Sequence, residues 1–234
     1  MIYQGNTSNT TGTATQIQTG RFNSSYNDNM YVGYMYQSNE VHGLTSSSTI
    51  KGILDQWYQN NLTSVADKID KNAGFCGDRQ PSTSDTTNNG LGGTGTTQTY
   101  YGGYIRLKIN QNSVSPTFEC QNENDLYTTR GSEQGNKALT YPIGLITADE
   151  VVYAGGSWFS NNQSYYLYTN QNYWTMSPFY FRVSNAFMFR VYSNGNLYDF
   201  LVTGTSGVRP VINLKADVTI SAGNGSAGNP FEIY

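Results

Sequence analysis

The sequence is poor in charged residues, because Asp, Glu, Lys and Arg make up only 12% of its 234 residues. This is about half the share that is usual in soluble proteins. The formal net charge is −3, and the sequence contains no cluster of Lys or Arg. Proteins that bind nucleic acid need such a cluster to contact the phosphates. We therefore expect no nucleic-acid partner.

Long apolar runs are also missing. No stretch has the length of a membrane span or of the apolar part of a signal peptide. We therefore expect no membrane insertion by this segment. If the protein is exported, its leader or anchor is absent from this chain.

Residues typical of catalytic centres are scarce. The single histidine, His42, stands in a Val-His-Gly context without a nucleophile motif. The spacing Gly90-x-Gly92-x-x-Gly95 resembles a dinucleotide fingerprint, but the strand and helix that this fingerprint requires do not flank it. We expect no catalysis, no cofactor and no metal site. A carbohydrate-active hydrolase stays as an alternative, because scattered Asp side chains can converge in a fold.

Only two cysteines occur, Cys76 and Cys120, and two thiols cannot complete a zinc site. In an oxidising compartment they would pair, whereas in a reducing cytoplasm they would be two buried thiols. The low Lys and Glu content and the long Ser, Thr and Asn tracts favour export. We therefore predict a disulfide and an extracellular or cell-surface location.

Tyrosine is abundant, with 20 copies, and Asn, Ser, Thr and Gly fill much of the remainder. Antibody combining sites use this mixture, because tyrosine gives a large contact area at a low cost in conformational entropy. A tyrosine-rich, twisted β protein has the same composition. Composition alone therefore allows either a binding surface or an ordinary β core.

Two segments carry helix signals. Ser48 is the expected N-cap of a helix whose apolar stripe has the spacing i, i+3, i+4, i+7 and consists of Ile50, Ile53, Leu54 and Trp57. Further along, Thr147 and Glu150 form a capping-box pattern, and Gly155 can end that helix. This pattern predicts that the Asp149–Glu150 pair serves helix capping rather than catalysis.

Several segments favour strands. We predict strands at residues 30–36 and in "YYGGYIRLKI" at residues 100–109, and short β-type runs fill the C-terminal third. The "SNGN" sequence between Tyr192 and Leu197 predicts a hairpin turn. Helices and strands together predict one α+β domain at residues 30–234, with mostly antiparallel strands. Residues 1–29 are expected to form an extended N-terminal arm or edge strands.

Four motifs carry a family resemblance: "ALTYPIGLITADEVVYAGG", "NYWTMSP", "AFMFRVYSNGNLYDFLV" and "GVRPVINLKADVTIS". Together they resemble a bacterial surface-protein domain, often pilin-linked, related to the C-type-lectin and formylglycine-generating-enzyme folds. Several members resemble variable proteins of diversity-generating retroelements, which scatter Asn, Tyr, Asp and Ser over a fixed scaffold. The resemblance covers residues 30–234 and is most specific at residues 140–214. It implies a C-type-lectin-like fold with a variable display region at about residues 173–208.

The resemblance also implies which side chains are displayed. With Phe189 and Val191 directed inward, strand alternation directs Arg190 and Tyr192 outward. The candidate ligand-binding residues are Tyr180, Arg182, Phe187, Arg190, Tyr192, Tyr198, Asp199, Phe200, Thr203, Thr205 and Ser206. The face built from Tyr180, Arg182, Arg190, Tyr192, Tyr198 and Phe200 is expected to be exposed to solvent and to bind a partner.

Departures from two branches of the family narrow the expected function. The oxidase branch needs a C-terminal pair of reactive cysteines, and both cysteines here lie upstream. The calcium-dependent sugar-binding branch carries Glu-Pro-Asn or Trp-Asn-Asp, and neither occurs. We therefore expect an exported, non-catalytic ligand-binding or adhesin module. Its partner would be a protein or glycan on a host, phage or neighbouring cell surface. A structural pilin subunit is a further alternative.

Overall fold

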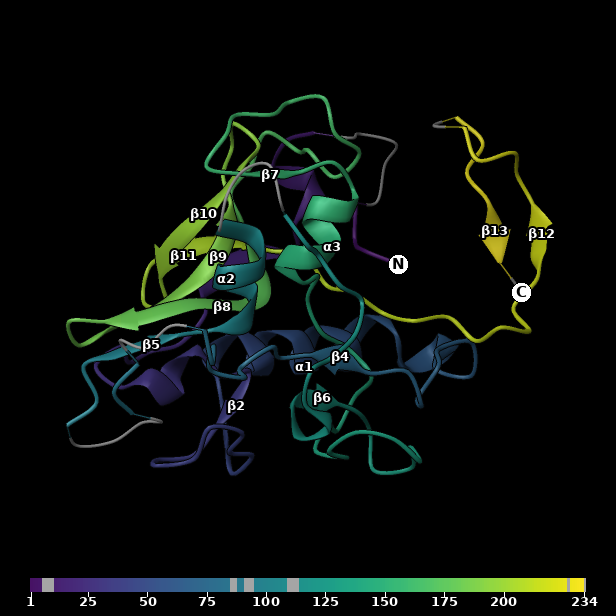
Figure 1. Cartoon of the computed structure of the whole chain (residues 1–234). Helices are drawn as coiled ribbons and strands as arrows, with labels where there is room; N and C mark the ends of the chain where they lie inside the picture. Colours follow the sequence, from purple (N-terminus) through teal and green to yellow (C-terminus); the bar gives the residue numbers. More distant parts are fainter. Residues whose placement is uncertain (6–10, 85–87, 91–94, 109–113, 227, 234) are drawn as a thin grey trace.

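A seven-stranded mixed sheet forms the centre of the computed structural model (Figure 1), which describes residues 1–5, 11–84, 88–90, 95–108, 114–226 and 228–233. The strand order is β1-β11-β8-β9-β10-β7, and β5 pairs with β8 as a side branch. The pairs β11–β8 and β10–β7 are parallel, and the other pairs are antiparallel. These strands are β1 (Gln18–Arg21), β5 (Gln98–Tyr100), β7 (Ser157–Trp158), β8 (Tyr173–Arg182), β9 (Asn185–Val191), β10 (Asn196–Leu201) and β11 (Thr205–Val208).

Short elements surround this sheet. The α-helices are α1 (Thr49–Asn61), α2 (Gly102–Lys108) and α3 (Ala148–Tyr153), and the 3-10 helices are η1 (Thr13–Thr15), η2 (Asn29–Val32), η3 (Thr63–Val65) and η4 (Glu123–Asp125). Three small sheets consist of β2 (Met35–Tyr36) with β3 (Ser46–Ser47), β4 (Phe75–Cys76) with β6 (Leu126–Tyr127), and β12 (Ile220–Ala222) with β13 (Glu232–Ile233). The predicted α+β class is confirmed. In the part of the chain that the structure describes, no helix has both the length and the apolar content of a membrane span.

The central sheet is covered on both faces, and each face has its own apolar core. Successive residues of a strand point to opposite faces, and Met188 and Phe189 accordingly belong to different clusters. The first cluster includes Ile50 and Leu54 of α1, and the second includes residues of α2 and α3. In Figure 1, α2 crosses in front of β8 and β9, whereas α1 runs below the sheet.

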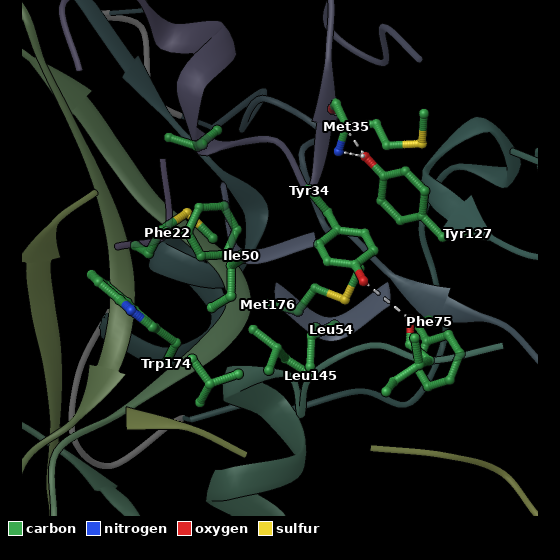
Figure 2. Packing of buried hydrophobic residues seen from close by; sticks show 14 of the residues in the cluster. Phe22, Tyr34, Met35, Ile50, Leu54, Phe75, Tyr127, Leu145, Trp174 and Met176 are labelled. Atoms are coloured by element: carbon green, nitrogen blue, oxygen red, sulfur yellow. Dashed lines mark hydrogen bonds between the residues drawn. The ribbon is translucent and has the colours of Figure 1, made fainter. Parts of the chain in front are cut away.

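The first core explains part of the high tyrosine content. Figure 2 shows Tyr34 and Tyr127 among aliphatic side chains, with their rings 5.5 Å apart in an edge-on arrangement. The Tyr34 hydroxyl donates to the Ile143 carbonyl, and the Tyr127 hydroxyl bonds the backbone of Met35. Each phenol thus contributes apolar area and keeps its polar end hydrogen-bonded. The buried tyrosines of the first core are Tyr34, Tyr58, Tyr101 and Tyr127, and those of the second core are Tyr104, Tyr165 and Tyr173.

Both predicted caps are confirmed. The Ser48 hydroxyl accepts a hydrogen bond from the Lys51 backbone N–H at 3.2 Å and begins α1. Thr147 and Glu150 form the reciprocal capping box of α3, with bonds of 3.1 and 2.7 Å. Gly155 follows that helix with φ at 98°, a backbone conformation that favours glycine.

Two predicted strands are largely wrong. Residues 30–32 lie in η2, where the Asp28 carboxylate accepts from the Met30 backbone N–H, and only Met35–Tyr36 forms a strand. In residues 100–108 the chain leaves β5 at Tyr100 and becomes α2. Tyr104 and Leu107, three residues apart, are both buried. Residues three apart lie on the same face of a helix. Burial of this face against the sheet therefore favours a helix over the predicted strand.

The N-terminal residues contribute an edge strand rather than only an arm. Strand β1 pairs with β11 over the full length of both strands. Phe22, directly after β1, is completely buried in the first core. The C-terminal hairpin β12–β13 lies apart from the main sheet at the right of Figure 1.

Candidate functional site

Two tight hairpins hold the segment predicted to display a ligand site. Strands β8 and β9 are joined through Val183 and Ser184, whose φ values of 49° and 61° lie in the left-handed region. Strands β9 and β10 are joined by the predicted "SNGN" turn, where Gly195 has φ at 80°. The register of β8 against β9 shifts on either side of Pro178. A bulge is where an internal strand tolerates proline, and it explains the irregular alternation here.

The structure separates the eleven candidate residues by burial. Arg182 and Thr205 are exposed, and the partly exposed candidates are Tyr180, Phe187, Tyr192, Tyr198, Asp199, Phe200 and Thr203. Arg190 and Ser206 are buried, with 6% and 2% of their surface accessible. The expected solvent exposure is therefore wrong for Arg190. The Arg190 side chain points away from the second core, which contains Phe189. It is nevertheless buried, because the opposite face of the sheet is covered by the first core and by residues such as Phe200.

Four of the candidates meet on one surface of the sheet. Tyr180 and Phe187 lie side by side with ring centres 4.9 Å apart. The buried ring of Phe179 connects them to Tyr198, at 4.7 Å from Tyr180 and 5.7 Å from Tyr198. Asp199 follows Tyr198 on β10, and its carboxyl interacts electrostatically with the Tyr180 and Tyr198 hydroxyls.

Two aromatic residues that the sequence did not indicate complete this surface. The parallel pairing of β7 with β10 places Trp158 opposite Leu197. Phe159 then lies 5.0 Å from the Tyr198 ring, and 58% of its surface is exposed. We call the group Trp158, Phe159, Tyr180, Phe187, Tyr198 and Asp199 the aromatic surface. Its only hint in the sequence is the adjacent pair Trp158–Phe159 in a Gly- and Ser-rich stretch.

Asp199 is the acidic residue of the aromatic surface. Burial among the rings raises the pKa of its carboxyl, although the interactions with Tyr180 and Tyr198 counteract the increase. Burial, with a contribution from Asp199, in turn raises the pKa of Tyr180 to about 12. The tyrosine hydroxyls thus stay protonated near neutral pH and can donate hydrogen bonds.

Three other candidates form a stack on the opposite face. The guanidinium carbon of Arg190 lies 3.8 Å from the centre of the Tyr192 ring and 3.5 Å from that of Phe200. The Tyr192 hydroxyl donates to the backbone carbonyl of Asp199 at 2.7 Å and fixes the position of that ring. Desolvation by burial lowers the pKa of Arg190. We call these three residues the arginine stack.

The remaining candidates do not join either group. Thr205 and Ser206 pair with Arg21 and Gly20 of β1, and β8 separates their strand from β9. Arg182 ends β8 at the hairpin, and Thr203 follows the end of β10. The predicted display region therefore contains two separate clusters rather than one continuous face.

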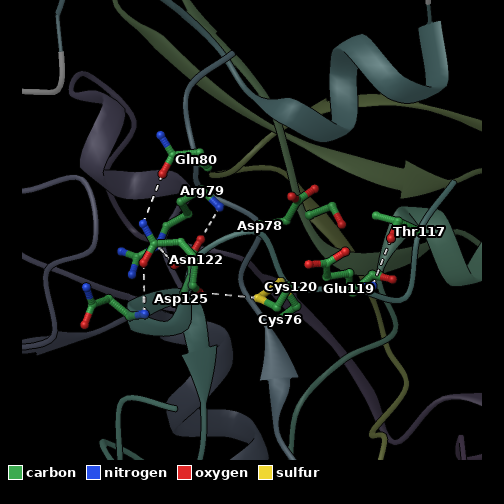
Figure 3. The surroundings of a disulfide bond; sticks show 12 residues. Cys76, Asp78, Arg79, Gln80, Thr117, Glu119, Cys120, Asn122 and Asp125 are labelled. Atoms are coloured by element: carbon green, nitrogen blue, oxygen red, sulfur yellow. Dashed lines mark hydrogen bonds and ion pairs between the residues drawn. A yellow bond between two sulfur atoms is a disulfide. The ribbon is translucent and has the colours of Figure 1, made fainter. Parts of the chain in front are cut away.

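The predicted disulfide between Cys76 and Cys120 is present, with a Cα–Cα distance of 5.5 Å. Figure 3 shows it between the Arg79–Asp125 pair on one side and Asp78 and Glu119 on the other. A cavity of about 260 Å³ lies beside it, lined by Phe118, Arg106, Asp78, Asp149 and Glu150 among others. This cavity bears on the hydrolase alternative, because it brings carboxylates together.

One guanidinium joins two of the carboxylates at this cavity. Nη2 of Arg106 lies 2.8 Å from Asp78 and 2.8 Å from Asp149. Asp149 also accepts a hydrogen bond from the Thr117 backbone N–H at 3.0 Å. Its carboxylate thus pairs with Arg106 and does not form the predicted helix cap, which Glu150 provides. Burial raises the pKa of Asp78 to about 7, and Arg106 opposes this increase. The guanidinium lies between these two carboxylates, and Glu119 and Glu150 also line the cavity.

His42 belongs to a buried polar network. Its Nδ1 lies 3.5 Å from Asp125, and its Nε2 lies 3.1 Å from the Asn122 side chain. Arg79 pairs with the same Asp125 at 2.6 Å. Over the described ranges, no three His, Cys, Asp or Glu side chains come close enough together to hold a metal ion. Most of the Gly90–Gly95 motif lies outside the described residues.

No protein family model, curated protein or solved structure matches the chain. The arrangement of its own side chains is therefore what bears on function. Three features stand out as candidates: the aromatic surface, the arginine stack and the cavity beside the disulfide.

Proposed function

We propose that the protein is an exported, non-catalytic ligand-binding or adhesin module built on a C-type-lectin-like scaffold. The observation that carries this proposal is the aromatic surface. It places Phe159, which directly follows β7 and has 58% of its surface exposed, 5.0 Å from the partly exposed Tyr198 of β10. Aromatic residues on a rigid support are frequent anchors in binding sites.

Packing alone does not account for this surface. The second core already includes the fully buried Phe189 and Leu197. The outer rings of Phe159 and Tyr198 add exposed apolar area, which favours association with a partner. Phe179 holds the surface in place from below, because its ring contacts both Tyr180 and Tyr198. Rigid support reduces the entropy that the side chains lose when a ligand binds.

Other features support the export and variability in this proposal. A disulfide fits an oxidising compartment. Partly exposed candidates lie on both β9 and β10, the two strands that the tight turn at Gly195 joins. Such positions can change residue type at little cost to the core, as variable proteins of retroelements require. The hydrolase alternative has less support, because Arg106 bridges Asp78 and Asp149, two of the carboxylates of the cavity.

The aromatic surface predicts a defined mutational result. Fluorescent, tetramerised protein would be screened on arrays of glycans and on cell surfaces, and each bound ligand titrated. We expect Tyr198→Ala and Phe159→Ala each to weaken binding at least tenfold, about 1.4 kcal/mol. Their melting temperatures should stay close to that of the wild type, because surface changes usually alter stability by less than about 0.5 kcal/mol.

The matched control is Tyr166→Ala. Tyr166 has 88% of its surface exposed but lies outside the aromatic surface, so its loss should leave binding unchanged. Equal binding by the Tyr198 variant and the wild type, or unfolding of the Tyr198 variant, would contradict the proposed function.

A further inference from the structure

Arg190 differs from the other buried arginines in how its charge is compensated. Arg79 pairs with Asp125 at 2.6 Å, and Arg106 pairs with Asp78 and Asp149. Arg209 donates to the backbone carbonyls of Leu167 and Tyr3 at 3.2 Å. Arg190, like Arg209, has no carboxylate within ion-pair distance in the described part of the chain. Unlike Arg209, it donates to no backbone carbonyl there, and its charge is compensated by the Tyr192 side chain, the Phe200 ring and, at longer range, the Asp199 carboxylate.

The surroundings of Arg190 leave hydrogen-bonding capacity unused. Its Nε is buried and has no hydrogen-bond partner among the described residues. Only 6% of the residue is accessible. The rings of Tyr192 and Phe200 attract the cation, but an aromatic face accepts no in-plane hydrogen bond. Burying a charge without such bonds costs free energy, so this feature calls for a reason other than stability.

We infer that the arginine stack is an anion-binding subsite that takes a carboxylate group of an acidic glycan. This inference rests on the proposed ligand-binding function and names the chemistry of its ligand. The two rings stand at 81° to each other with centres 6.5 Å apart, and they contact the guanidinium from two sides. A guanidinium held in this way can bind a planar carboxylate through two parallel hydrogen bonds. Tyr192, which covers one face of the cation, is itself partly exposed and lies at the end of β9.

The charge of the protein favours a ligand with isolated carboxylates. The net charge is −3 and no basic cluster occurs, so a dense polyanion would be repelled. Amide groups surround the turn that follows Tyr192, where Asn194 bonds Asn161 at 2.8 Å and Asn172 accepts from Ser193 at 2.9 Å. Amides both donate and accept, which matches sugar hydroxyls. A uronic-acid sugar combines such hydroxyls with one carboxylate.

The test follows the side-chain Nε–Hε signal of Arg190 in ¹⁵N NMR spectra of the full chain. The probes are glucuronic acid, neutral glucose and a short glutamate-containing peptide. We expect glucuronic acid to shift the Arg190 signal saturably and glucose not to shift it. Arg190→Met should weaken glucuronic acid binding at least tenfold, and Arg190→Lys should lose most of the affinity because it lacks the planar fork.

The control variant is Arg130→Met, which removes an exposed arginine outside the candidate ligand-binding residues and should bind as the wild type does. Arg190→Met should keep or raise the melting temperature, because an apolar side chain replaces a buried cation. An Arg190 signal that glucuronic acid leaves unmoved, or equal binding by Arg190→Met, would overturn the inference. A response to the peptide but not to the sugar would overturn the assignment to glycans.

The two proposals fail separately. If Tyr198→Ala abolishes binding of a screened ligand while Arg190→Met leaves it unchanged, the ligand-binding function stands and the anion subsite is wrong. If Arg190→Met abolishes glucuronic acid binding while the Tyr198 variant retains every ligand, the subsite stands and the aromatic surface is not the principal site.

Discussion

Replacing Phe189 with Ala is expected to lower the free energy of unfolding by about 3–5 kcal/mol. Phe189 has no exposed surface and contacts Phe179 with ring centres 4.7 Å apart. It also lies in the core that joins α2 and α3 to the sheet. Removal of the ring leaves a cavity that the surrounding β9 backbone cannot close. Denaturant unfolding of both proteins, followed by circular dichroism, measures the difference.

Phe187 provides the matched control for this prediction. It lies two residues before Phe189 on the same strand, and it packs at the border of the same core while remaining partly exposed. Phe187→Ala should therefore cost less than half as much stability as Phe189→Ala. An equal loss in the free energy of unfolding for the two variants would contradict the distinction between scaffold and display positions on β9.

Removing the disulfide is expected to cost about 4 kcal/mol, the loop-entropy value for cysteines 44 residues apart. The bridge restricts the unfolded chain, and it also ties β4 to the segment that lines the cavity with Phe118 and Glu119. The double variant Cys76→Ser/Cys120→Ser should unfold at a correspondingly lower urea concentration. Intact mass before and after reduction and alkylation reports the bond itself.

Treating the double variant with the same reductant provides the control, because it should change nothing further. Two freely alkylated thiols in native wild-type protein would contradict the bond. A double variant as stable as the wild type would contradict its stabilising role.

Features that depend on local chemistry could be predicted from the sequence. The Ser48 cap, the Thr147–Glu150 capping box and the Asn194–Gly195 turn each involve residues within one or two turns of the chain. The cysteine pair was predictable because only two cysteines exist. In residues 100–108, where tyrosine and glycine are frequent, the apolar residues follow neither the helical nor the strand period clearly. The structure forms a helix there, because it buries Tyr104 and Leu107 on one face.

The candidate site was predictable only in part, because contacts distant in sequence shape it. Trp158 and Phe159 reach Tyr198 through the short parallel pairing of β7 with β10, which no local pattern indicates. Strand alternation correctly placed Arg190 opposite Phe189. It gave no sign that Phe200 and Tyr192 would enclose the guanidinium.

The central claim is that a ligand binds at the aromatic surface, and amide hydrogen exchange with and without a ligand found by screening tests it most directly. The account predicts slower exchange in β7, β10 and the stretch around Tyr180 and Phe187, with the segment at the disulfide unchanged. Slower exchange confined to the residues around the cavity of Arg106 and Asp149, with the aromatic surface unaffected, would contradict the account.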